Sequence, residues 1–320
     1  RAPFESILSH GFVVDGKGLK MSKSVGNVIA PEDILKKYGA DILRIWVASS
    51  NYAEDLRIDY SILDQHADSY RKIRNTFRYL LGNINDDFQE IDLESMDIKK
   101  LPELEQFMLH KIYSLDLNFK KYFKNYDFHN LYKELLNFCT VDLSSFYFDI
   151  RKDSLYCDPK DSNKRQSVIL LLKVILNALL KWFAPILSFT TEEIYKLVSN
   201  KKSVHLEKFI NFPIMFKNDL LYLKWLELIK IRNECNLSIE EKRANKIIGS
   251  SLEASLKIQL NKKNLEIVKN IDLSELCITS EVNIEESFKN EIIVETQKAK
   301  GDKCPVCWKI NKLPCDRHGN

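Results

Sequence analysis

The sequence predicts a mainly α-helical protein with several modules, and three observations support this fold class. Across residues 61–215, apolar side chains recur at helical spacing, as Leu101, Leu104 and Met108 do. Near the start, a glycine-flanked loop rich in lysine follows a short apolar strand, and near the end cysteine and histidine residues crowd together. We therefore expect four segments: an α/β start over 1–60, a helical bundle over 61–215, a small α+β unit over 216–298 and a metal-binding tail over 299–320.

The composition fits a folded chain with more than one core. Its 320 residues suffice for two or three domains, and 45% of them are hydrophobic. The 48 basic and 45 acidic residues leave a net charge of +3, so general attraction to nucleic acid is weak and any RNA contact must be local. Four of the seven cysteines are scattered singly, as buried thiols of a reducing compartment are: Cys139, Cys157, Cys235 and Cys277.

The first element is a short strand that runs into a lysine-rich loop. Phe12-Val13-Val14 leads into Asp15-Gly16, a hairpin-turn signal, and the loop then reads Lys20-Met21-Ser22-Lys23-Ser24. Glycines at 16, 18 and 26 let the backbone move or approach a ligand closely. The two lysines could place ammonium groups on phosphate oxygens and stabilise the charge that grows on a departing pyrophosphate. The alternative is an exposed turn in a lysine-rich chain.

Two helices are expected after this loop. Pro31 opens the first and Gly39 closes it, which is the usual placement of proline at a helix start and of glycine at its end. A second helix begins near Asp41. These elements complete the α/β start.

The helical bundle contains an apolar stretch and an aromatic stretch. Residues 168–187 are apolar enough to suggest a membrane helix, but Lys173, Lys181 and Pro185 interrupt them. A buried bundle helix explains this stretch better. The aromatic residues over 138–156 are most simply part of the same core.

One face of the bundle is predicted to be basic. Arg71, Arg74 and Arg78 are spaced by three and four residues, so they share a face of one helix, with Lys72 beside them. Guanidinium groups bind phosphates in bidentate fashion, and these four residues are our candidates for contact with an RNA backbone. A solvated face that interacts with neighbouring carboxylates is the alternative.

The segment after residue 216 predicts a small α+β unit. A helix is expected over 220–246, before Gly249. Strands are expected at 252–260, 276–279 and 292–296.

The tail carries a zinc-binding pattern. Cys304 and Cys307 are separated by two residues, as are Cys315 and His318, and seven residues separate the two pairs. Thiolates and imidazole suit Zn²⁺, and four protein ligands leave no open position, so we expect one structural zinc per chain. So short a segment would depend on the metal to fold. The alternative is a disordered tail with reduced thiols.

Several of these motifs together resemble the class I aminoacyl-tRNA synthetases. The similarity runs from Gly11-Phe12-Val13-Val14-Asp15 through the lysine loop and Val25-Gly26-Asn27 to Tyr38-Gly39-Ala40-Asp41. It continues in Ile248-Gly249-Ser250-Ser251-Leu252-Glu253-Ala254 and, with the cysteine-rich end, covers nearly the whole chain. Within this class the chain is most similar to the isoleucyl enzymes of bacterial type.

The resemblance implies an activity and a division of the chain. Enzymes of this type activate isoleucine with ATP and Mg²⁺ to an adenylate and pass the acyl group to the terminal adenosine of tRNA(Ile). Residues 1–60 would complete the class I nucleotide-binding catalytic domain, and 61–215 would form the anticodon-binding domain. We expect a cytoplasmic monomer with no membrane association.

The resemblance also implies roles for the residues of the loop. Lys23 would contact the ATP phosphates and Lys20 would assist it. Met21, Ser22 and Ser24 would pack and hydrogen-bond the loop into its closed form.

The chain departs from the family pattern in three respects. The family's zinc module carries four cysteines and lies against the tRNA, whereas here His318 stands in place of the last cysteine and the gap between the ligand pairs is shorter. The family's histidine-containing nucleotide motif and its inserted editing domain do not occur in these 320 residues. Because Arg1 stands where a methionine would begin a protein, we expect the C-terminal part of a longer enzyme, inactive by itself.

Three alternatives stay open at this point. A valyl, leucyl or methionyl enzyme would share the lysine loop. A non-catalytic RNA-binding module could combine a helical bundle with a zinc knuckle. A structural scaffold would carry the lysine loop by accident.

Overall fold

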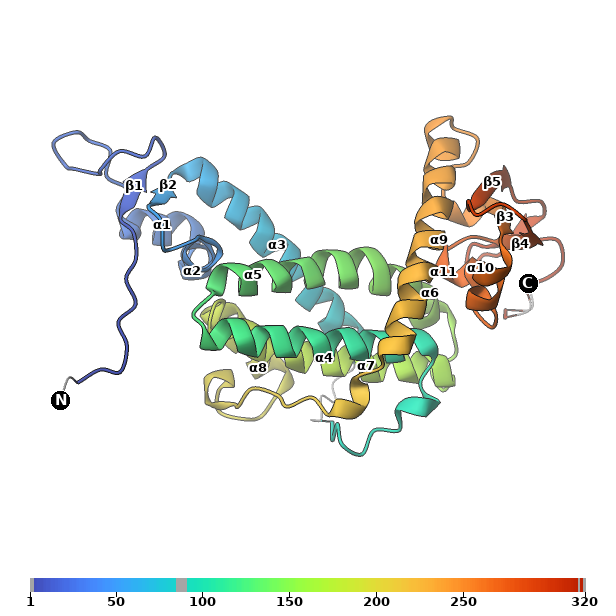
Figure 1. The fold of residues 1–320 in the computed structure, drawn as a ribbon, viewed down its shortest axis with the longest axis horizontal. Helices are drawn as coiled ribbons and strands as arrows, with labels where there is room; N and C mark the ends of the chain where they lie inside the picture. Colours follow the sequence, from blue (N-terminus) through green and yellow to red (C-terminus); the bar gives the residue numbers. More distant parts are fainter. Residues whose placement is uncertain (1–2, 85–90, 316, 319–320) are drawn as a thin grey trace. The chain divides into compact units, whose positions relative to one another are not determined.

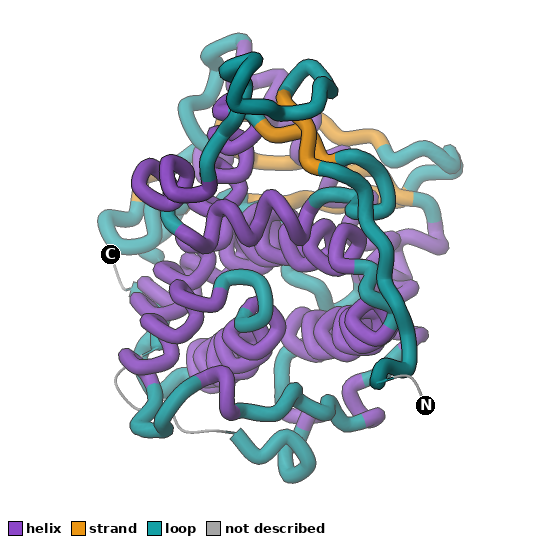
Figure 2. Tube along the Cα trace, turned by 90° about the vertical axis from the view of Figure 1, so that its left-hand side faces the viewer, coloured by secondary structure: helices purple, strands orange, loops and turns teal. Residues whose placement is uncertain are grey.

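The computed structural model describes residues 3–84, 91–315 and 317–318. This described part is mostly helical, with a few short strands (Figures 1 and 2). The mainly helical fold class is therefore confirmed. The chain forms two compact units. The first comprises Arg1–Asp97, Lys111–Phe146 and Ile169–Ile214, and the second comprises Ile98–His110, Tyr147–Val168 and Met215–Asn320.

The first unit begins with a small α/β substructure. Strand β1 (Val13–Asp15) pairs in parallel with β2 (Leu56–Ile58). Helices α1 (Pro31–Tyr38) and α2 (Ala40–Ser49) lie between these strands in sequence, close to the predicted positions. The glycine that separates the two helices has a φ of 84°, a left-handed conformation that favours glycine.

Helices form the rest of the first unit. Their aromatic side chains make a continuous core: Phe119 lies 6.0 Å from Trp182 and 5.1 Å from Phe209, measured between ring centroids. The predicted core role of the aromatic stretch is confirmed for Phe138, Phe146, Tyr147 and Phe148, which are buried, whereas Tyr156 at its end is exposed. Most apolar side chains of residues 168–187 are buried as well. The helices of this unit are α3 (Tyr60–Asn83), α5 (Phe128–Asn137), α8 (Ser188–Val198) and the single turn η3 (Val204–Leu206).

Four further segments contribute residues to both units. They are α4 (Glu103–Lys124), the π-helical stretch η2 (Phe138–Tyr147), α7 (Asn163–Phe183) and the short turn η4 (Ile214–Phe216). Among the described residues, α7 alone is long and apolar enough to cross a membrane. Within its most apolar window 67% of the residues are buried inside the protein, as in the core helix of a helical bundle.

The second unit packs helices against a three-stranded sheet. The central strand β3 (Ala254–Leu260) pairs in parallel with β4 (Glu281–Glu286) and antiparallel with β5 (Ile293–Lys298). Every second side chain of β3 is buried, and α9 (Asp219–Ala244) contacts both β3 and β5. The other elements are η1 (Ile98–Lys100), α6 (Phe148–Cys157), η5 (Ser251–Glu253), α10 (Lys262–Val268), α11 (Leu273–Leu276), β6 (Asp302–Lys303) and β7 (Ile310–Asn311).

One strand prediction is wrong. Residues 276–279 were expected to form a strand, but α11 ends within them and the strand begins at Glu281. Asp272 accepts a hydrogen bond from the backbone N–H of Glu275 at 3.0 Å, so a helix cap precedes this apolar run. A helix start of this kind outweighs the strand preference of a few apolar residues.

Candidate functional site

The lysine loop starts from a tight turn after β1. The N–H of Gly18 donates to the carbonyl of Asp15 at 2.9 Å, and Lys20 forms an antiparallel bridge with Val14. A Cβ added to Gly16 would lie 2.3 Å from Oδ2 of Asp59, so a larger residue here would have to displace the Asp59 side chain. The turn predicted at Asp15-Gly16 is therefore present, and it lies against Asp59, the residue that caps α3.

A single amide side chain organises this loop. Asn27 accepts a hydrogen bond from the N–H of Ser22 at 2.9 Å and donates to the Asp15 carboxylate at 2.9 Å and to the Lys20 carbonyl at 3.3 Å. The bond from Asn27, followed by the N–H of Leu19, lowers the pKa of Asp15 below its ordinary value. Asn27 thus joins the two ends of the loop.

The five predicted loop residues occupy different environments. Met21 is half-buried and packs on the core cluster that contains Trp46 and Ile34. Ser22 and Ser24 approach each other with 3.1 Å between their hydroxyl oxygens. Lys20 and Lys23 are exposed. The loop therefore presents two ammonium groups to solvent from a backbone that is anchored on its other side.

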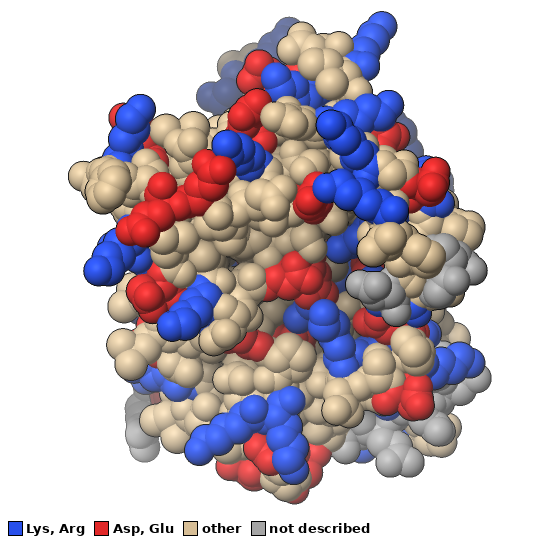
Figure 3. Space-filling model, turned by 90° about the vertical axis from the view of Figure 1, so that its right-hand side faces the viewer, with Lys and Arg blue, Asp and Glu red and all other residues tan. Residues whose placement is uncertain are grey.

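The predicted basic face lies on α3, in the same unit as the lysine loop. Arg71, Lys72, Arg74 and Arg78 are all exposed. Arg71 also forms an ion pair with Asp68, which offsets part of its charge. On the face of the molecule drawn in Figure 3, basic and acidic side chains are interspersed. A contact with an RNA backbone would therefore depend on local groups such as this face of α3.

The four predicted metal ligands come together in the second unit. Sγ of Cys304, Cys307 and Cys315 and a ring nitrogen of His318 all lie within 4.8 Å of one another. Sγ of Cys307 is 3.9 Å from Sγ of Cys315, and Nδ1 of His318 is 3.3 Å from the latter. A tetrahedral zinc with Zn–S bonds of about 2.3 Å places its sulfur ligands roughly 3.8 Å apart. The side chains therefore fit a four-coordinate zinc.

His318 also has the second contact that a metal-bound histidine needs. Its Nε2 lies 3.2 Å from the carbonyl of Cys157, the last residue of α6, so the N–H on that nitrogen can donate there while Nδ1 faces the sulfurs. Backbone N–H groups of Cys307 and Val306 lower the pKa of the Cys304 thiol to about 6, which favours its thiolate at neutral pH. His318 therefore lies where it could serve as the fourth metal ligand.

Ion pairs attach the tail to α6 and to the residue that follows it. Arg317 forms ion pairs with Asp153 on α6 and with Asp158 just beyond it. Strands β6 and β7 pair antiparallel, and a Cβ on Gly301 would lie 2.1 Å from the carbonyl oxygen of Asn311. We call residues 301–318, with this hairpin and its four ligands, the knuckle.

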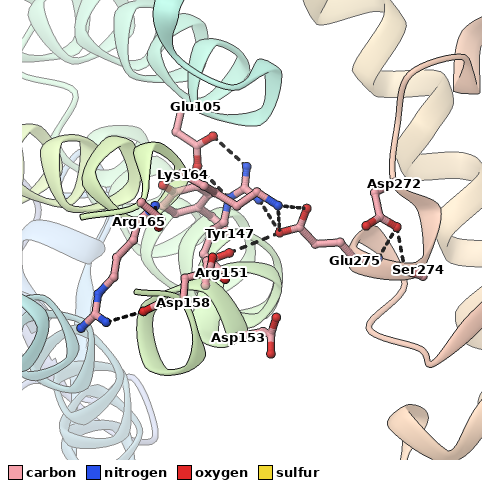
Figure 4. Close-up of polar contacts among 12 residues, drawn as sticks. Glu105, Tyr147, Arg151, Asp153, Asp158, Lys164, Arg165, Asp272, Ser274 and Glu275 are labelled. Carbon is pink, nitrogen blue, oxygen red and sulfur yellow. Dashed lines mark hydrogen bonds and ion pairs between the residues drawn. The ribbon is translucent and has the colours of Figure 1, made fainter. Parts of the chain in front are cut away.

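A buried ionic network fixes α6 in turn. Arg151 donates from Nε and Nη2 to the two carboxylate oxygens of Glu105, both at 2.7 Å, and from Nη1 to Glu275 at 2.8 Å (Figure 4). Tyr147 donates to Glu105 at 3.0 Å, and Lys164 donates to Glu275 at 3.0 Å. Two carboxylates and two cations balance each other, which a buried network requires.

Sequence reasoning missed several of these supporting residues. Asn27, Arg151 and Arg317 have partners that lie 12, 46 and 164 residues away. Asn27 directly follows Gly26 and lies in the family-like segment, a signal that could have marked it. No local pattern indicates the other two.

Two family models match this chain. The model "tRNA synthetases class I (I, L, M and V)" matches residues 1–59, and the model "Anticodon-binding domain of tRNA ligase" matches residues 105–259. Together they cover the lysine loop and most of the helices of both units.

Curated relatives match along the chain. An isoleucine–tRNA ligase of Pelagibacter ubique is 74% identical over 321 aligned residues, which span 100% of this chain and 36% of that protein. Isoleucine–tRNA ligases of Petrotoga mobilis and Agrobacterium fabrum are 40% and 39% identical, over 97% of this chain in both cases. The chain therefore spans about a third of the length of these relatives.

One solved structure shows a similar fold. It is a ternary LeuRS–tRNA–LeuAMS complex from Agrobacterium radiobacter, with a TM-score of 0.50 and 12% sequence identity. The similarity covers 88% of this chain and 32% of that one. At this identity the likeness concerns the fold alone.

Proposed function

The chain belongs to the class I tRNA synthetases, and from this premise we propose that it is the ATP-loop and tRNA-binding part of an isoleucine–tRNA ligase. The ligase would activate isoleucine with ATP and Mg²⁺ and transfer it to tRNA(Ile). Residues 1–60 would belong to the catalytic domain, 61–215 to the anticodon-binding bundle, 216–298 to the α+β unit and 299–320 to the zinc tail. We propose a cytoplasmic monomer.

The observation that carries the proposal is the lysine loop. Two exposed lysines stand on a backbone that Met21 and Asn27 anchor from the other side. In the activation step the isoleucine carboxylate attacks the α-phosphorus of ATP, the bond to the bridging oxygen breaks and pyrophosphate leaves. Lys23, assisted by Lys20, would neutralise the charge that accumulates on the leaving phosphates.

Transfer would follow with the tRNA on the bundle. A hydroxyl of the terminal adenosine attacks the acyl carbon and AMP leaves with the bonding electrons. Arg71, Lys72, Arg74 and Arg78 are exposed on α3 and would hold the RNA backbone without reading its sequence. Their charge would position the tRNA rather than select it.

The zinc tail would have a structural role. The four ligands would be Cys304, Cys307, Cys315 and His318. A bound zinc would cross-link the knuckle, which is too short to be stabilised by a hydrophobic core. Since no ligand position would remain for substrate, the zinc would take no part in acyl transfer.

Lys23→Ala in the full-length ligase tests the proposal. Isoleucine-dependent ATP–pyrophosphate exchange should fall about 100-fold or more, because the substitution removes a charge that acts in the transition state, while isoleucine affinity should hold. Lys17→Ala is the matched control, since Lys17 is an exposed lysine at the start of the same loop. Unchanged exchange in the Lys23 variant would remove the lysine loop from the reaction.

A further inference from the structure

Helix α8 begins without a capping side chain of its own. Its N-cap residue is Leu187, which makes no side-chain hydrogen bond to the helix. The first backbone N–H groups of a helix need acceptors, and a leucine side chain has none. Asp41 supplies them from α2, 149 residues earlier in the chain.

The geometry of this distant cap is close. Oδ2 of Asp41 accepts from the N–H of Thr190 at 2.8 Å and from its hydroxyl at 2.6 Å, and Oδ1 accepts from the N–H of Phe189 at 3.3 Å. The Asp41 side chain is only 7% exposed, so these charge-assisted bonds are shielded from water. A carboxylate at a helix N-terminus also interacts favourably with the helix dipole.

The same contact reaches α3. Because the single hydroxyl proton of Thr190 goes to Asp41, the hydroxyl of Tyr70 on α3 must donate to Thr190, and the two oxygens are 2.9 Å apart. Thr190 is 6% exposed. One buried point therefore joins α2, α8 and the helix that carries the basic face.

Arg44 lies one turn after Asp41 on α2 and contacts the segment just before α8. Its Nε donates to the carbonyl of Ile186 at 2.9 Å and its Nη2 to the carbonyl of Pro185 at 2.6 Å. These carbonyls lie in the turn between α7 and α8. We call Asp41 and Arg44 the α2 clamp: a carboxylate on the helix start and a guanidinium on the carbonyls of the turn before it.

Helix α2 also supports the lysine loop. Trp46 belongs to the core cluster on which Met21 of the loop packs. Its indole N–H donates to the carbonyl of Arg57 in β2 at 3.0 Å. The lysine loop and the bundle are thus attached to the same ten-residue helix, the loop through Trp46 and the bundle through the clamp.

We propose that Asp41 and Arg44 are positioning residues for the transfer step, which fix the lysine loop relative to the helices that hold tRNA. The inference rests on the function proposed above. The tRNA held on α3 and the adenylate formed at the lysine loop must meet for transfer, so a small rotation of α2 would misplace the reacting hydroxyl. Adenylate formation needs no tRNA and would not depend on this alignment.

Asp41→Asn in the full-length ligase separates these two steps. The amide has the size of the carboxylate, but it loses the charge and turns one acceptor into a donor. In either orientation of the amide this donor faces an N–H group, that of Phe189 or that of Thr190. We expect kcat/KM for tRNA charging to fall about tenfold or more, and tRNA-independent ATP–pyrophosphate exchange to stay within about twofold. Asp33→Asn is the matched control, because it makes the same chemical change at an exposed position on α1.

Three further substitutions, two at Thr190 and one at Arg44, keep the test decisive if Asp41→Asn fails to fold. Thr190→Val removes the hydroxyl and should reduce tRNA charging but not ATP–pyrophosphate exchange. Thr190→Ser retains the hydroxyl and should charge tRNA at the rate of the unaltered ligase. Arg44→Lys replaces a two-point donor with one ammonium and should act in the same direction as Thr190→Val.

The outcomes distinguish this inference from the proposed function. If exchange and charging fall by the same factor in these variants, or if neither changes, the clamp has no positioning role and the inference is overturned. If the unaltered ligase forms no isoleucyl-adenylate, the proposed function fails first, and the inference fails with it.

Discussion

The lysine loop and the knuckle are both short segments with candidate functional side chains, but they are held in opposite ways. In the loop, Lys20 and Lys23 are exposed, and Asn27 is the one side chain that joins its two ends among the described hydrogen bonds. In the knuckle, three cysteines are buried and Arg317 binds two carboxylates of the supporting segment. A lysine that meets a passing substrate, as proposed for Lys23, stays exposed and lightly held, whereas three of the four groups that could hold a zinc are buried.

The largest effect is expected on removal of the zinc that we propose for the knuckle. Structural zinc contributes about 10–16 kcal/mol of apparent binding energy to small zinc modules at neutral pH, so chelation should disorder residues 302–315 while the lysine loop is unaffected. Cys307→Ser should lose the metal, because three ligands bind zinc far more weakly than four. Elemental analysis measures the zinc content, and hydrogen exchange measures the local order.

The control for this experiment is Cys157→Ser. Cys157 packs against the three cysteine ligands but is not among the four groups that converge. This variant should keep one zinc per chain. One zinc per chain in the Cys307→Ser variant would contradict the proposal that the knuckle holds its zinc with four ligands.

The next effect concerns the support beneath the knuckle. Arg151→Met should destabilise the protein by about 3–5 kcal/mol, because Glu105 would be left buried without its cation. Urea unfolding measures the loss. A second substitution, Glu105→Met, should recover part of it by removing the unpaired charge.

Arg71→Met is the matched control for Arg151→Met. It breaks an exposed ion pair on α3 and should cost no more than about 1 kcal/mol. Equal losses of unfolding free energy in the two arginine variants would show that burial does not determine how much these ion pairs contribute to stability.

A smaller effect is expected at the lightly held loop. Asn27→Ala removes the bonds to Asp15 and to the loop backbone, so the loop should spend less time in a productive form. ATP–pyrophosphate exchange in the full-length ligase should fall about tenfold with little change in the thermal midpoint. Asn75→Ala, at an exposed position on α3, should leave both values unchanged. A large loss of stability in the Asn27 variant would mean that the loop is as firmly built as the knuckle.

The smallest effect concerns the cap beside the loop. Asp59 accepts from the N–H of Ile62 at 2.8 Å, and Asp59→Ala should cost about 1 kcal/mol. The bonds from Ile62 and from the Ser61 hydroxyl lower the pKa of Asp59 below 3.8. Its contribution is therefore present above the ordinary carboxyl pKa and is lost as the pH falls through the lowered value. The thermal midpoint of Asp59→Ala should lie below that of the unaltered protein at neutral pH, and the two midpoints should converge at acid pH. A difference that stays constant with pH would contradict this account.

Local patterns in the sequence determined much of what the structure contains. Proline and glycine set the ends of α1, and helical spacing predicted the bundle, because both depend on residues within a few positions. The paired cysteines and histidine predicted the four side chains that converge, since each short spacing brings two donors close and only seven residues separate the two pairs. The lysine loop is visible as a string of adjacent residues.

The tertiary structure alone decided which residues support these motifs. Asp41 ends the family-like segment Tyr38-Gly39-Ala40-Asp41, but nothing in that segment shows that it caps a helix 149 residues away. Arg151 pairs with Glu105, which lies 46 residues earlier in the chain. At residues 276–279 a capped helix ends where a strand was expected. A buried charge or an uncapped helix end needs a partner, but the chain brings that partner from any distance, so no local pattern can name it.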